Sequence, residues 1–150
     1  MEQTQDVHRR HPADRREYRN DAIVIHWEPG LCIHAAECLK RLPSVFDRRA
    51  RPWVNVAGAD PDAIAAVISA CPSGALRFER LDGGLQEDIP ETTTIHPQPD
   101  GPYYVRGRID VKCPDGSMRT ASRAALCRCG ASENKPYCDL SHKTVRFKSP

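Results

Sequence analysis

The sequence has no long hydrophobic run, few aromatic residues and no large excess of either charge. Its longest uncharged stretch, residues 63–76, contains Pro72 and is shorter than the roughly 18 to 20 apolar residues that span a bilayer. We therefore expect no membrane segment. Aromatic residues make up 6 % of the chain. Because a nucleic-acid surface interleaves aromatic with basic side chains, we expect no nucleic acid as a partner.

The first twenty residues lack the apolar core that a secretory signal requires. They are highly charged, so we expect a flexible arm over residues 1–20 and a cytoplasmic protein. The chain also lacks a catalytic triad, a Gly-rich phosphate loop and a paired-carboxylate site. We therefore expect a protein that is not an enzyme by itself, although it can serve as an accessory to an oxidoreductase.

The residues present in excess are cysteine and proline, with seven and thirteen copies. In a reducing compartment, clustered cysteines hold metal more often than they form disulfides. The odd number of cysteines agrees with this, because seven cannot all pair within one chain. The prolines interrupt the chain so often that two small modules fit better than one large core.

Composition divides the chain into an arm at 1–20, a first module at 21–80, a linker at 81–91 and a second module at 92–150. The linker carries two glycines, a proline and four acids. The first module has equal numbers of basic and acidic side chains, whereas the second has ten basic and five acidic, a net charge of +5. The second module is therefore expected to meet acidic surfaces.

Hydrophobic periodicity predicts an α+β fold in which a small α/β module precedes a small β-rich module. In the first module, strands are predicted at 22–27, 52–56 and 75–78, with helices at 35–42 and from an Asp60 N-cap to Cys71. In the second module, strands are predicted at 92–96, 103–111 and 118–122. Cys113 is predicted to be a strand residue rather than a ligand.

A C-x-C-x8-C-x3-H array near the C-terminus consists of Cys127, Cys129, Cys138 and His142. The first two can point the same way on an extended segment, and the last two can share one face of a helical turn. Three thiolates and one imidazole suit an iron–sulfur centre. Structural zinc is an alternative, although its usual hairpins are C-x2-4-C. Cysteines buried without metal are a third interpretation.

Residues 127–142 resemble the CDGSH iron–sulfur domain of mitoNEET-type and many bacterial proteins. The match includes both short spacings and the intervening residues Gly130, Ser132, Pro136, Asp139 and Ser141. The resemblance implies a 2Fe-2S cluster held by the three cysteines and His142. Such domains often bring two motifs together, so a homodimer is one arrangement that the resemblance suggests.

Two details of this motif affect the expected chemistry. Leu140 stands where the family usually has glycine, so we expect a changed turn and changed shielding of the cluster, with binding retained. A histidine ligand makes the site less negative than four thiolates do, and a less negative site is easier to reduce. Because imidazole can be protonated and leave, the cluster is also expected to be labile or transferable.

The first module carries a second set of three cysteines, Cys32, Cys38 and Cys71. Single-cluster ferredoxins use C-x2-C-x2-C with a remote C-P, and here Ala35 occupies the middle cysteine position. Residues 22–79 resemble the divergent single-cluster ferredoxin-like family in four stretches: C-x-H at 32–34, L-P-x-V-F at 42–46, R-P-W at 51–53 and C-P-S-G-A-L at 71–76.

This second resemblance implies a ferredoxin-like module with a 3Fe-4S or 4Fe-4S cluster on the three cysteines. His34 is the nearest candidate for a fourth ligand; its alternative role is a loop histidine that donates a hydrogen bond to sulfur. A module without metal, in which the cysteines are only buried, is the remaining interpretation.

Two one-electron centres in one chain predict an electron-transfer protein that relays electrons within the molecule. The alternative is storage, transfer or redox sensing of an iron–sulfur cluster, and a zinc-containing binding module is a weaker alternative. The expected partners are redox proteins or apo iron–sulfur acceptors.

Overall fold

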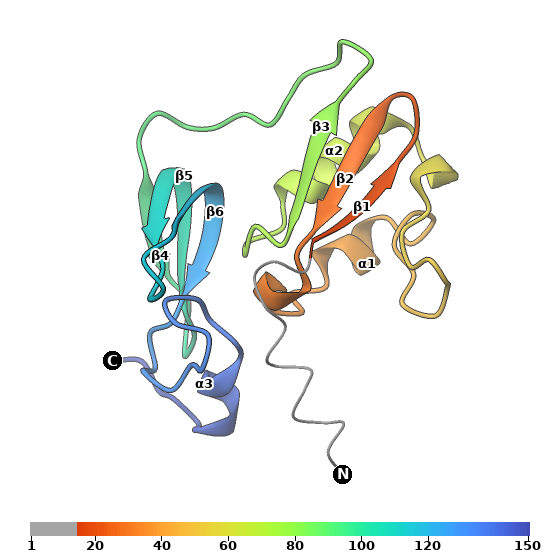
Figure 1. Cartoon of the computed structure of the whole chain (residues 1–150). Helices are drawn as coiled ribbons and strands as arrows, with labels where there is room; N and C mark the ends of the chain where they lie inside the picture. The colour runs from red at the N-terminus through yellow and green to blue at the C-terminus, as the bar shows by residue number, and fades with distance from the viewer. Residues whose placement is uncertain (1–14) are drawn as a thin grey trace.

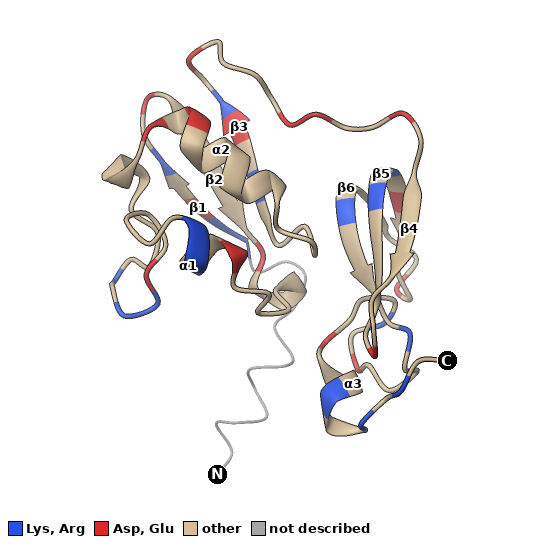
Figure 2. Cartoon of the chain, turned by 180° about the vertical axis from the view of Figure 1, so that it is seen from behind, with Lys and Arg blue, Asp and Glu red and all other residues tan. Residues whose placement is uncertain are grey.

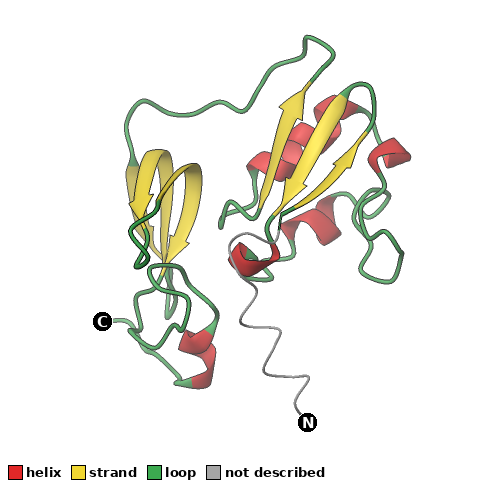
Figure 3. Ribbon diagram, viewed as in Figure 1, coloured by secondary structure: helices red, strands yellow, loops and turns green. Residues whose placement is uncertain are grey.

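A computed structural model of the protein describes residues 15–150. It contains two three-stranded antiparallel sheets that lie side by side (Figure 1). The first sheet has the order β1 (Arg16–Arg19), β2 (Ile23–Trp27), β3 (Leu76–Arg80). The second has the order β4 (Thr94–Pro97), β5 (Tyr103–Lys112), β6 (Met118–Leu126). The helices are short: α1 (Glu37–Arg41), α2 (Pro61–Ser69), α3 (Ser141–Thr144) and the 3-10 helices η3 (Pro29–Leu31) and η4 (Val56–Gly58) (Figure 3).

The core of the first module forms where α2 packs on the first sheet. The helix begins at the predicted N-cap, where the Asp60 carboxylate accepts a hydrogen bond of 2.9 Å from the Ala63 N–H. Its Ile64 and Ile68 are fully buried, as are Ile23 and Ile25 of β2. The helical spacing of apolar residues thus predicted α2, and the β-branched and aromatic run at 22–27 predicted the central strand β2.

The expected flexible arm is wrong for the part of it that the structure describes, because residues 16–19 form strand β1. Residues 1–14 lie outside the described residues. Backbone hydrogen bonds to β2 make this strand, and they do not require apolar side chains. Tyr18 packs against the core, and the Arg16 guanidinium lies 5.5 Å from the centre of the Trp27 ring.

The predicted strand at 52–56 is also wrong. Only an isolated bridge between Phe46 and Val54 forms there, and the chain then turns into η4. The Asn55 side chain accepts a hydrogen bond of 3.2 Å from the Ala57 N–H, which caps the turn and ends extended pairing. With so few regular elements, the first module does not show a clear ferredoxin-like α/β arrangement, and the molecule as a whole is rich in sheet.

The second module is dominated by the β5–β6 hairpin. Strand β6 extends to Leu126, four residues beyond its predicted end, and delivers the chain directly to Cys127. Cys113 stands one residue past the end of β5 instead of within it, and its N–H donates to the Ser117 carbonyl at 2.8 Å in the turn.

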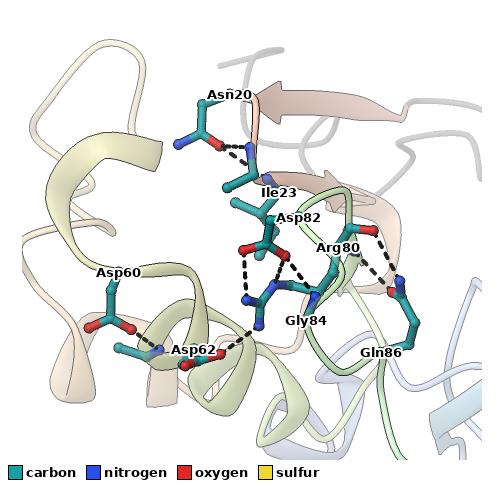
Figure 4. A network of polar contacts seen from close by, with 10 residues as sticks. Asn20, Ile23, Asp60, Asp62, Arg80, Asp82, Gly84 and Gln86 are labelled. Carbon is teal, nitrogen blue, oxygen red and sulfur yellow. Dashed lines mark hydrogen bonds and ion pairs between the residues drawn. The ribbon is translucent and has the colours of Figure 1, made fainter.

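The connection after β3 contains no helix or strand, and its first residues are tied to the first module (Figure 4). The Arg80 guanidinium donates hydrogen bonds to Asp82 and Asp62, and the Gln86 amide pairs with the main chain of Arg80 in both directions. The bonds to Arg80 lower the pKa of the Asp82 carboxyl to about 2. Across residues 15–150, the structure has no helix with the length and apolar character needed to cross a membrane.

Candidate metal centres

The four residues of the C-terminal array lie in two close pairs. The Sγ atoms of Cys127 and Cys129 are 4.0 Å apart, and the Cys138 Sγ is 3.5 Å from His142 Nδ1. Two such ligands on one tetrahedral metal atom lie roughly 3.6 to 3.8 Å apart. Each pair therefore fits one metal atom of a binuclear centre. Within residues 15–150, no three His, Cys, Asp or Glu side chains are grouped so as to hold a single metal ion.

The end of strand β6 brings the two pairs toward each other. The Cys127 N–H donates to the Pro136 carbonyl at 2.8 Å, and the Cys138 N–H donates to the Ala125 carbonyl at 2.9 Å. The intervening loop closes on buried Ser132, whose hydroxyl donates to the Tyr137 carbonyl at 2.6 Å. These hydrogen bonds continue the pairing beyond β6, and the loop between Cys129 and Cys138 closes the site.

The predicted shared helical face for Cys138 and His142 is wrong. Helix α3 begins only at Ser141, and Leu140 before it has a left-handed backbone with φ of 72°. This turn, held by the Asp139 carboxylate accepting from the Ser141 N–H at 3.0 Å, folds His142 back toward Cys138. A left-handed residue favours glycine, which gives a physical reason for glycine at this position in the resembled family.

Leu140 has a packing role that offsets its backbone conformation. Its side chain packs against a buried cluster of Ile33 from the first module with Ala125 and Cys138 from the second. The departure from the motif therefore places an apolar side chain where the two modules meet.

The substitution Leu140→Gly is expected to shorten the lifetime of the C-terminal cluster severalfold while changing the free energy of unfolding by less than about 1 kcal/mol. Relief of the left-handed backbone offsets the lost packing, but water reaches the site more easily. Decay of the cluster absorbance in air measures the first effect, and denaturant unfolding the second. An unchanged decay would show that Leu140 does not shield the site.

Local hydrogen bonds and burial affect how the C-terminal cysteines and His142 can bind a metal. The main-chain N–H groups of Ala131 and Leu140 each donate to a cysteine sulfur, Cys129 and Cys138 respectively, at 3.4 Å. Burial raises the pKa of the Cys138 thiol, so a bound metal must displace its proton. Burial, with Lys143 nearby, lowers the pKa of His142, which favours the neutral imidazole that binds metals.

The structure also brings together the three cysteines of the first module. Cys32 directly follows η3, Cys38 lies in α1, and Cys71 lies just past the end of α2. Burial raises the pKa of Cys38 to about 11, and the Cys71 thiolate adds to that rise. Burial likewise raises the pKa of Cys32, with a smaller contribution from Cys71. Cys38 and Cys71 pack against the core of the first module, and Cys32 and Cys71 pack against the cluster at the contact between the modules.

Two polar side chains lie beside these sulfurs. His34 is exposed, and its Nδ1 is 3.9 Å from the Cys32 Sγ, a distance that fits a weak hydrogen bond to sulfur. The Ser73 hydroxyl is 3.6 Å from the Cys71 Sγ and also accepts from the Ala75 N–H at 3.2 Å. The sequence reasoning missed Ser73, although its place in the C-P-S-G stretch was a usable signal.

Cysteines of both sets lie against the contact between the modules: Cys32 and Cys71 of the first set, and Cys138 of the second. One buried cluster joins Leu31 and Ala75 of the first module to residues of the second and packs against Cys32 and Cys71. The other is the cluster that contains Cys138. Tyr104 packs against that second cluster; burial raises its pKa, and the charges of Cys138 and Cys71 add to the rise.

A buried carboxylate reinforces the contact with ion pairs. Glu28, only 1 % exposed, is bound by Arg77 of its own module at 3.0 Å, by Arg119 of β6, and by Arg15 at 3.4 Å. Burial opposes the charge of Arg119, but its hydrogen bond and attraction to Glu28 outweigh that effect and raise its pKa. The sequence reasoning missed this network, and nothing local in the sequence could have indicated it.

Two comparisons with known proteins agree with this arrangement. Residues 18–80 match the family described as divergent 4Fe-4S mono-cluster, and residues 100–143 match the family described as iron-binding zinc finger, CDGSH type. The uncharacterized protein YjdI of Escherichia coli K12 is 29 % identical over 61 residues, which cover 41 % of this chain and 80 % of that protein. YjdI of Escherichia coli O157:H7 matches to the same extent.

The two cysteine sets and the two family matches together indicate an iron–sulfur protein. The chain carries a divergent 4Fe-4S mono-cluster domain followed by a CDGSH iron–sulfur domain. Both resemblances noted in the sequence are thereby confirmed, in the order in which they were expected.

Proposed function

We propose that the protein is a cytoplasmic electron carrier that relays single electrons between two iron–sulfur centres. The proposed ligands of a 2Fe-2S centre are Cys127, Cys129, Cys138 and His142. Those of a 3Fe-4S or 4Fe-4S centre are Cys32, Cys38 and Cys71, with His34 as a hydrogen-bond donor or fourth ligand. When bound, such clusters supply reversible one-electron chemistry.

The observation that carries this proposal is that both ligand sets border the same buried contact between the modules. Ile33 follows Cys32 in the chain and packs against Ala125 and Cys138, so one apolar side chain connects the surroundings of the two sets. A protein that only stored two clusters would have no need to bury both sets against one interface.

The partner is proposed to be a redox protein with an acidic docking surface. Exposed basic residues lie on β5, at Arg108 and Lys112, and in α3, at Lys143 (Figure 2). Opposite charge increases the rate of encounter and favours the correct orientation of the partner.

Iron, zinc and sulfide analysis of anaerobically purified protein tests the two centres. We expect about five or six irons per chain with matching sulfide. Cys138→Ser should remove about two irons, and Cys71→Ser about three or four, each leaving the electron paramagnetic resonance signal of the other centre. Cys113→Ser is the matched control and should remove none. Zinc without sulfide would overturn the proposal.

A second measurement separates electron relay from cluster handling. Relay predicts that both centres are reduced and reoxidised repeatedly without loss of iron. Storage or transfer predicts instead that the 2Fe-2S cluster moves to an apo acceptor protein on mixing, which absorbance and iron analysis of the separated proteins would detect.

A further inference from the structure

Arg123 belongs to strand β6 of the second module, but its side chain lies within the first. The side chain is 3 % exposed. Its guanidinium donates hydrogen bonds to the carbonyl of Cys71 and, at 2.9 Å, to the carbonyl of Leu76. Its remaining donors bind the Glu87 carboxylate at 2.6 and 3.3 Å. A buried positive charge from one module thus contacts the main chain of a cysteine assigned to the centre of the other.

The backbone geometry keeps Arg123 at this position. Strand β6 is the strand of the second sheet nearest the first module in both overall views (Figures 1 and 2). A Cβ atom on Gly74 would lie 2.4 Å from the carbonyl oxygen of Arg123, so the strand contacts the turn that follows Cys71 directly. The charge therefore has little freedom to move away from that cysteine.

A charge in this place changes the free energy of adding an electron. Coulomb interactions are stronger in a poorly hydrated interior than in water, and a nearby positive charge stabilises the more negative reduced state. The Glu87 carboxylate, which forms an ion pair with Arg123, has the opposite effect: its negative charge destabilises the reduced state. The two charges oppose each other beside the same centre.

We infer that Arg123 and Glu87 set the reduction potential of the N-terminal centre, so that the second module controls how readily the first accepts an electron. The inference rests on the proposed function, because it requires that Cys32, Cys38 and Cys71 hold a cluster. Arg123 is a positioning residue in this role: it acts through the main chain of Cys71.

The test is a redox titration of the full-length protein, in which electron paramagnetic resonance follows the N-terminal centre. Arg123→Gln should weaken electron binding about tenfold, a fall of about 59 mV in midpoint potential. Glu87→Gln should strengthen it by a similar factor, because it leaves the arginine charge uncompensated. Arg123→Lys keeps the charge and should restore most of the potential.

A matched control uses another arginine that crosses the contact. Arg106 donates to the Ser69 carbonyl at 3.2 Å but is exposed, so Arg106→Gln should leave the potential unchanged. Opposite shifts for Arg123→Gln and Glu87→Gln support the inference, because a merely structural role moves both variants the same way. Shifts of the same sign, or no shift in Glu87→Gln, would overturn it.

The result also separates this inference from the proposed function. An N-terminal signal with a potential that neither substitution moves overturns the inference and leaves the electron-carrier proposal standing. Wild-type protein without any N-terminal iron–sulfur signal overturns both.

Discussion

Replacing Glu28 with glutamine is expected to lower the free energy of unfolding by about 3 kcal/mol, because it removes the one negative charge from a buried ion-pair network. Glu28 accepts from Arg77 and Arg119, one from each module. Burial already lowers the pKa of Arg77, in spite of its attraction to Glu28. Without the carboxylate, the guanidinium groups repel one another across the contact between the modules.

Urea unfolding, followed by circular dichroism, measures this loss. Glu37→Gln is the matched control, because Glu37 pairs with Arg41 at 3.0 Å on the exposed side of α1. An exposed pair one helical turn apart contributes about 0.3 to 0.5 kcal/mol. Equal effects of the two substitutions would mean that the Glu28 network adds nothing beyond an ordinary surface ion pair.

Replacing Gly74 with alanine is expected to destabilise the protein by about 3 kcal/mol, from backbone strain and a steric clash together. Gly74 has a left-handed backbone with φ of 72°, which alone disfavours a side chain. The new Cβ would also lie 2.4 Å from the Arg123 carbonyl oxygen, a main-chain atom that cannot rotate away. Strand β6 must then move back from the turn after Cys71, and the contact between the modules opens.

Gly83→Ala isolates the backbone part of this effect. Gly83 has a similar φ of 81°, and no atom lies within 4 Å of its Cβ position. It should therefore lose only about 1 kcal/mol. Thermal unfolding compares the two variants, and limited proteolysis of the 81–91 connection reports whether the modules separate. If the two variants are equally stable, the close approach of Arg123 to Gly74 is not a constraint.

The residue pattern predicted secondary structure correctly where the local side chains are enough to form the element. The Asp60 N-cap and the spacing of Ile64 and Ile68 predicted α2 because a helix needs both a capped end and an apolar face. Pattern failed for β1, where polar residues 16–19 pair by backbone hydrogen bonds. It failed again at Leu140, because a left-handed turn is not predicted by a leucine.

The candidate ligands were predictable for a related reason. Metal sites built from one short segment place their ligands by local turns, so spacing identifies Cys127, Cys129, Cys138 and His142 as a set. The first module was harder, because Cys71 is remote from Cys32 and Cys38 in the sequence and joined them only through the resemblance.

By itself, the sequence predicted two modules and grouped the four C-terminal donors, because composition and spacing are local properties. Only the tertiary structure decided that both cysteine sets border one shared interface and that Arg123 reaches Cys71. The residues of that interface are far apart in the chain: Arg119 and Glu28 are separated by 91 positions. Contacts of this kind depend on how two folded surfaces fit together, and no periodicity or spacing in the sequence encodes that fit.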